Sequence, residues 1–157
     1  MKKITIDTNI IPADDIINIC KNRGYEYACI SVTNREIEGS SLEKDMKVIP
    51  SVPEYALFGE ARFGRARFHG KESSKILQDI LSIISNGSFP QDRRNLSQGQ
   101  RRMLRDAIIL QTHVTDKRDI FITNDKRAFI KNGLRQKLEN NFNIAILTRE
   151  EFIRNNS

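Results

Sequence analysis

Short apolar runs alternate along this chain with longer segments in which apolar residues recur at helical spacing. Four runs have the length of strands that are covered on both faces: 3–7, 28–32, 120–123 and 144–147. Five segments have the spacing of helices: 13–22, 33–47, 72–86, 97–115 and 126–140. Thr148 and Glu151 form a capping-box pattern that predicts one more short helix. Strands that alternate with helices predict a three-layer α/β/α fold around a central, mostly parallel sheet of four or five strands.

The stretch from about 50 to 97 interrupts this alternation. Pro50 and Pro53 break the pattern, and from 51 to 70 we expect a loop-rich arm with one or two helical turns at most. A length of 157 residues is typical of one domain, so we expect a single domain, 1–157, with a helical and loop excursion at about 50–97.

Acidic residues stand where two of the predicted strands end. Asp7 ends the run Ile4–Ile6, and Asp125 follows the run 120–123. The carboxyl ends of parallel strands form the edge at which open α/β sheets bind ligands. Glu36 follows the second strand, and Asp106 lies at the flank of the apolar stripe of its helix. Clustered carboxylates repel one another unless a cation lies among them, and Mg²⁺ prefers oxygen ligands.

Each of these acids also has a structural interpretation. Asp7 can cap the turn that follows it, and Asp125 can cap the helix that begins at Lys126. Thr33 and Glu36 form a capping box of their own, which would make the glutamate a cap rather than a ligand. Four polar neighbours of the acids are candidate supporting residues: Thr8, Asn9, Thr123 and Asn124.

The net charge of +6 is concentrated in one segment. Residues 62–105 carry ten basic and three acidic residues, and the rest of the chain carries sixteen and seventeen. A basic segment beside carboxylates suggests that a polyanion is steered to a metal. The candidate phosphate contacts are Arg62, Arg65, Arg67, Arg93, Arg94, Arg101, Arg102 and Arg105. Between 58 and 69 phenylalanines and arginines interleave, which suits either base stacking or a loop whose phenylalanines fill the core.

Two further features bear on the cellular compartment of the protein. Cys20 and Cys29 each lie among apolar neighbours, which predicts reduced core thiols. No run approaches the roughly 20 apolar residues that span a bilayer. We therefore expect a cytoplasmic protein with no membrane partner.

Four motifs together resemble those of PIN domains. They are Ile4-Thr5-Ile6-Asp7-Thr8-Asn9, Glu36 after the second strand, Arg105-Asp106-Ala107-Ile108 and Thr123-Asn124-Asp125-Lys126-Arg127-Ala128-Phe129. The resemblance runs from about 3 to 148, with 50–95 unmatched, and it implies a PIN-like fold. PIN domains are mostly Mg²⁺- or Mn²⁺-dependent ribonucleases, and many are the toxins of bacterial toxin–antitoxin pairs. The resemblance therefore implies that Asp7, Glu36, Asp106 and Asp125 are catalytic metal ligands.

We accordingly expect a metal-dependent endoribonuclease that hydrolyses RNA phosphodiester bonds with Mg²⁺ or Mn²⁺. RNA is the expected substrate, and an antitoxin protein and a second copy of the chain are candidate partners. The alternatives are a structure-specific DNA nuclease and a non-catalytic PIN-like RNA-binding or scaffold protein. A receiver domain or a dehalogenase-type phosphatase fits less well, because Asp7-Thr8-Asn9 lacks their acidic pair. Neither His69 nor His113 lies in a catalytic pattern.

Overall fold

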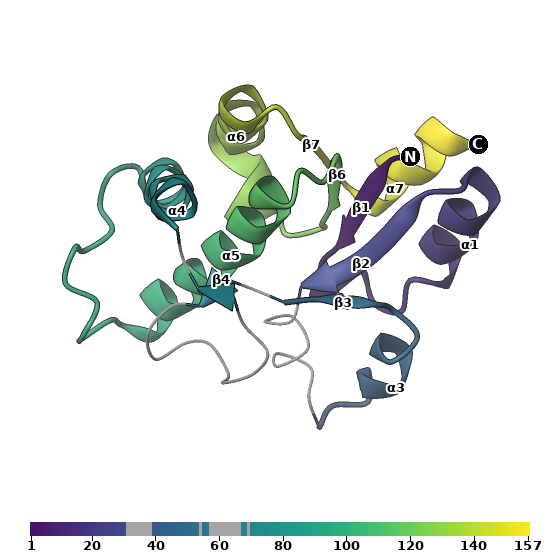
Figure 1. The fold of residues 1–157 in the computed structure, drawn as a ribbon, viewed down its shortest axis with the longest axis horizontal. Helices are drawn as coiled ribbons and strands as arrows, with labels where there is room; N and C mark the ends of the chain where they lie inside the picture. The colour runs from purple at the N-terminus through teal and green to yellow at the C-terminus, as the bar shows by residue number, and fades with distance from the viewer. Residues whose placement is uncertain (31–38, 54, 57–66, 69) are drawn as a thin grey trace.

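Five parallel strands form the central sheet in the computed structural model, which describes residues 1–30, 39–53, 55–56, 67–68 and 70–157. The strand order is β3-β2-β1-β6-β7, and all four neighbouring pairs are parallel (Figure 1). In sequence order, the strands of this sheet are β1 Lys3–Ile6, β2 Glu26–Ile30, β3 Ser51–Val52, β6 Ile120–Ile122 and β7 Ala145–Leu147. The predicted α/β fold with a parallel sheet is confirmed.

Helices cover both faces of the sheet, with α1, α3 and α7 on one side and α4, α5 and α6 on the other (Figure 1). Their bounds are α1 Asp14–Arg23, α3 Glu43–Met46, α4 Lys71–Ile84, α5 Gln98–Thr115, α6 Leu134–Phe142 and α7 Arg149–Asn156. The described part of the chain contains no helix long and apolar enough to cross a membrane.

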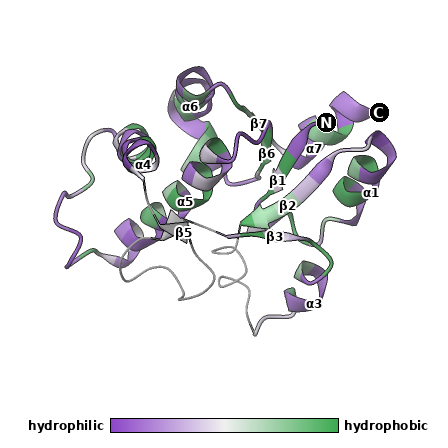
Figure 2. Cartoon of the chain, viewed as in Figure 1, coloured by the Kyte–Doolittle hydropathy of each residue, from purple (hydrophilic) through white to green (hydrophobic). Residues whose placement is uncertain are grey.

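Alternation along the strands divides the core into two clusters. Ile4 and Ile6 of β1 pack with α1 and α7, and so do Ile120 and Ile122 of β6. Phe121 points to the opposite face and packs with α4, α5 and α6. Successive side chains of a strand point to opposite faces, and β2, β6 and β7 contribute to both clusters. Hydrophobic residues accordingly gather on the strands and on the helix faces turned towards them (Figure 2).

Cys20 and Cys29 are both free and buried, as the sequence predicts. Burial raises the pKa of each thiol to about 11, so both remain protonated near neutral pH.

Three elements differ from the prediction. Residues 51–70 were expected to form loops and turns, yet they contain the edge strand β3 and a separate two-stranded sheet of β4 (Tyr55–Ala56) and β5 (Arg67–Phe68). The helix expected at 33–47 falls partly outside the described residues, and within 39–47 only α3 is helical.

The helix expected at 126–140 is divided into three pieces. A π-helical segment, Lys126–Ile130, and a 3-10 turn, Lys131–Gly133, precede α6. Asn132 and Gly133 have φ values of 58° and 76°, and a continuous right-handed helix does not accommodate this left-handed backbone.

Helix α5 runs from the carboxyl edge of the sheet to the opposite edge. Just beyond its end, Asp119 N donates to Lys3 O at the start of β1, so the other end of the helix lies where the strands finish. Ser97 caps that end in a complete capping box with Gln100. Asp106, in the middle of α5, lines one hollow together with Asp125 of the turn after β6.

Candidate active site

The Asp7 carboxylate is held in a fixed orientation directly after β1. Oδ1 accepts a hydrogen bond from Thr8 N at 2.8 Å. Oδ2 accepts from Thr123 Oγ1 at 2.7 Å and from Asn9 Nδ2 at 3.0 Å. Only 5% of Asp7 is exposed. These three donors are neutral, and together they fix the orientation of the carboxylate.

Thr123 joins the turns that follow β1 and β6. Its Oγ1 atom donates to Asp7 and accepts from Asp125 N at 3.0 Å and from Asn9 Nδ2 at 3.2 Å. Asn124 N donates to Asn9 Oδ1 at 2.7 Å. The two turns therefore form one hydrogen-bonded unit, in which Asn9 and Thr123 use their side chains and Asn124 its backbone N–H. Thr8 takes part through its backbone.

Arg149, at the start of α7, extends this unit, and sequence reasoning missed it. Its backbone N–H donates to Asn124 Oδ1 at 3.1 Å. Its guanidinium donates to Ile10 O and Pro12 O and makes two bonds with Asp15, at 2.6 and 2.8 Å. The bond from Arg149 holds the pKa of Asp15 below its usual value. An arginine after a capping threonine carries no sequence signal for this role.

Asp106 and Asp125 line the same hollow, which has a volume of about 820 Å³. Both are half-buried, so their carboxylates are accessible from the solvent. Asp125 Oδ1 accepts from Ala128 N at 2.9 Å, so the capping interpretation of Asp125 also holds. A carboxylate has two oxygens and about four acceptor sites, so one capping bond does not prevent it from binding a ligand.

Two arginines line this hollow beside the carboxylates. Arg102 comes from α5 and Arg127 from the π-helical segment after β6. Arg102 and Arg127 are both exposed. Arg127 was not predicted, because it lies outside the basic segment 62–105. Carboxylates and guanidinium groups on one surface suit a ligand that carries both a cation and a phosphate.

The remaining predicted residues have varied positions. Glu36 lies outside the described residues, and so do Arg62 and Arg65; for Arg67 only the backbone is described, in β5. Arg101 is exposed near the start of α5, and Arg105 is half-buried one turn later. Arg94 pairs with Asp92 at 2.8 Å on the surface.

Within the part of the chain that the structure describes, no three His, Cys, Asp or Glu side chains lie close enough together to hold a metal ion. Asp106 and Asp125 both line one hollow, and Asp7 is linked to the backbone N–H of Asp125 through Thr123.

No protein-family model, curated protein or solved structure matches this chain. The chain is an α/β protein with an all-parallel five-stranded sheet, whose carboxyl edge holds a hydrogen-bonded group of acidic and amide side chains.

Proposed function

We propose that the protein is a metal-dependent endoribonuclease of the PIN type, the family that its motifs resemble. The observation that carries this proposal is the shared hollow of Asp106 and Asp125, with Asp7 fixed to the same turn through Thr123. Asp7 lies about a hundred residues before the other two acids in the sequence. The parallel sheet accounts for their convergence, because the ends of β1 and β6 are neighbours.

The donor set suits a hard divalent cation. Mg²⁺ commonly binds one or two carboxylates and takes its other ligands from water and substrate phosphates. Asp106 and Asp125 would hold such an ion on the hollow, and Asp7 would add negative charge behind them. A bound Mg²⁺ or Mn²⁺ would supply Lewis-acid stabilisation of a phosphoryl group and a more acidic water.

The chain's own residues would position the RNA and the acids. Arg102 and Arg127 line the hollow and would hold phosphates on either side of the bond to be cut. Thr123 and Asn9 keep the Asp7 carboxylate in one orientation. A site fixed before substrate arrives needs less reorganisation during the reaction.

The two arginines beside the carboxylates, Arg102 and Arg127, also fit a regulatory role. The toxin of a toxin–antitoxin pair would be held inactive by a partner, and an acidic segment of an antitoxin would compete with RNA for the same arginines. A cytoplasmic setting and a homodimer are parts of the same proposal.

A cleavage panel tests this function. Labelled single-stranded RNA, single-stranded DNA and a DNA flap of matched sequence are incubated with the protein in Mg²⁺, Mn²⁺ or EDTA. We expect internal cuts in RNA with either metal, none in EDTA, and DNA left intact. Cleavage of the flap alone would favour a DNA nuclease. RNA that is bound but never cut would favour a non-catalytic RNA-binding protein.

A further inference from the structure

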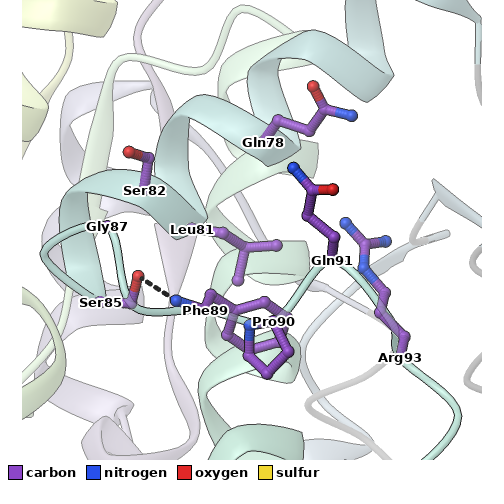
Figure 3. A pocket seen from close by; sticks show the side chains of 9 residues that line it. All are labelled: Gln78, Leu81, Ser82, Ser85, Gly87, Phe89, Pro90, Gln91 and Arg93. Carbon is purple, nitrogen blue, oxygen red and sulfur yellow. Dashed lines mark hydrogen bonds between the residues drawn. The ribbon is translucent and has the colours of Figure 1, made fainter.

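A second hollow, of about 500 Å³, lies between the C-terminal half of α4 and the loop that follows it (Figure 3). Leu81 of α4 and Phe89 and Pro90 of the loop supply its apolar wall. Gln78 of α4 and Gln91 of the loop supply two carboxamides. The volume falls within the range of small-ligand pockets, which combine apolar walls with a few polar groups.

Arg93 lines the same hollow and is an unusual arginine for this surface. It is half-buried, and burial lowers the pKa of its guanidinium. The neighbouring carboxylate, Asp92, is bound instead by Arg94, through bonds at 2.8 to 3.3 Å. Within the described residues, Arg93 has no hydrogen-bond or ion-pair partner. A partly desolvated, unpaired cation favours an anionic ligand.

The chemistry of the walls narrows the choice of ligand. Phe89 and Pro90 offer flat apolar surfaces, which suit the face of a nucleobase. A carboxamide carries both a donor and an acceptor, so Gln78 and Gln91 can pair with the edge of a base. In Figure 3 the side chains of Gln91 and Arg93 both extend from the loop towards α4, where Gln78 lies.

We propose that this hollow binds one nucleotide of the RNA substrate, with its base against Phe89 and its phosphate at Arg93. The proposal rests on the proposed ribonuclease function and defines where the strand runs beyond the cleavage site. Ile84 lines the hollow of the carboxylates, and Ser85, the next residue, lines this one. Adjacent residues at the end of α4 thus border the two hollows, and the proposed single strand would run from one hollow to the other.

The first test measures RNA binding in EDTA, so that cleavage does not alter the readout. Fluorescence anisotropy gives the Kd of a labelled single-stranded RNA octamer. Phe89→Leu should raise Kd about fivefold or more, because the stacked base loses its aromatic partner. Arg93→Gln should raise Kd and reduce the slope of log Kd against log salt by about 0.7.

Two control variants match these changes outside the hollow. Phe142→Leu removes another half-buried phenylalanine that packs on the same core cluster as Phe89. Lys75→Gln removes an exposed charge from α4 that does not line the hollow. Both should bind RNA like the parent, and circular dichroism should show all four variants folded.

The second test places a single abasic ribose at each position of the octamer in turn. At one position the missing base should weaken binding to the parent about fivefold or more and leave binding to Phe89→Leu unchanged. If the parent cuts RNA while Phe89→Leu and Arg93→Gln bind it as tightly and no position is coupled, this inference is overturned and the nuclease function stands. A parent that neither binds nor cuts RNA overturns the proposed function, and this inference with it.

Discussion

At the scale of single residues, hydrogen bonds decide which way the predicted acids face. The sequence indicates that Asp7, Thr123 and Asp125 lie near strand ends. It does not show that Thr123 Oγ1 bonds to both the Asp7 carboxylate and the Asp125 backbone N–H. Arg149 carries no signal at all, because two of its partners are the backbone carbonyls of Ile10 and Pro12 and a third, Asp15, lies 134 residues away. Such contacts depend on side-chain placement in three dimensions, which spacing along the chain does not specify.

Thr123 tests this hydrogen-bonded unit directly. Thr123→Val keeps the shape of the side chain but removes the bond of Asp125 N and the donor that Thr123 Oγ1 supplies to Asp7. We expect the free energy of unfolding to fall by about 1–3 kcal/mol, measured by urea denaturation. Thr123→Ser retains the hydroxyl and should recover most of that loss. Equal stability of the valine and serine variants would contradict the role assigned to the hydroxyl.

The burial of His113 makes the free energy of unfolding depend on pH. It is fully buried, and its Nδ1 atom lies 2.7 Å from Thr5 Oγ1. Burial and the positive charge of Arg118, which is bound to Glu26, lower the pKa of His113 to about 3. The unfolded chain takes up a proton near pH 6.5 and the folded protein does not, so stability is lost as pH falls below 6.5 towards 3.

One such histidine changes the free energy of unfolding by at most about 1.4 kcal/mol per pH unit. Urea denaturation at pH 7.5, 6 and 5 should show this loss in the parent and not in His113→Gln. His69→Gln, which changes the only other histidine, serves as the control. If His69→Gln abolishes the loss and His113→Gln does not, the assignment is wrong.

At the scale of elements, the sequence predicts what local signals specify. The capping boxes at Ser97 and Thr148 start α5 and α7. The edge strand β3 is too short to show a periodic pattern in the sequence. It is a strand because its backbone pairs with β2. The break before α6 comes from Asn132-Gly133, a pair that tolerates left-handed backbone. An apolar pattern that continues across the break concealed it.

Glycine substitutions test this interpretation of the break. Gly133→Ala places a side chain at φ 76°, and we expect a loss of about 1 kcal/mol in the free energy of unfolding. Gly99→Ala is the matched change within α5, where a Cβ meets nothing within 4 Å. That variant should be neutral or more stable by up to about 1 kcal/mol. Thermal denaturation distinguishes the two, and a harmless Gly133→Ala would contradict the strain argument.

At the scale of the whole molecule, the fold class followed from the alternation of strands and helices, because a parallel sheet requires it. The sheet order explains why the turns that carry Asp7 and Asp125 are neighbours, because they follow the paired strands β1 and β6. The location of the basic charge was visible in the sequence, but the pairing of Arg94 and the burial of Arg93 were not. Charge counts do not distinguish a paired side chain from a free one.

We expect RNA binding to depend on salt, because α5 carries several arginines near the carboxylate hollow. Replacing Arg101, Arg102 and Arg105 with glutamine removes three charges from α5 near the carboxylate hollow. The slope of log Kd against log salt for single-stranded RNA in EDTA should fall by about two, since fewer counterions are released. Affinity should weaken similarly for all sequences.

A control variant removes three exposed lysines elsewhere: Lys21, Lys44 and Lys137. Its salt slope should match the parent's. If the two triple variants lose the same slope, the effect is one of net charge and not of this surface.

The most direct test of the central claim is RNA cleavage by carboxylate variants in Mg²⁺. Asp7→Asn, Asp106→Asn and Asp125→Asn each keep the shape of the side chain and remove its charge. Asp79→Asn, an exposed change on α4 outside the hollow, is the control. We predict that each of the first three lowers the cleavage rate by about a hundredfold or more while the protein stays folded, and that Asp79→Asn cleaves like the parent. Parental rates in Asp106→Asn and Asp125→Asn would contradict a metal-dependent nuclease at this edge of the sheet.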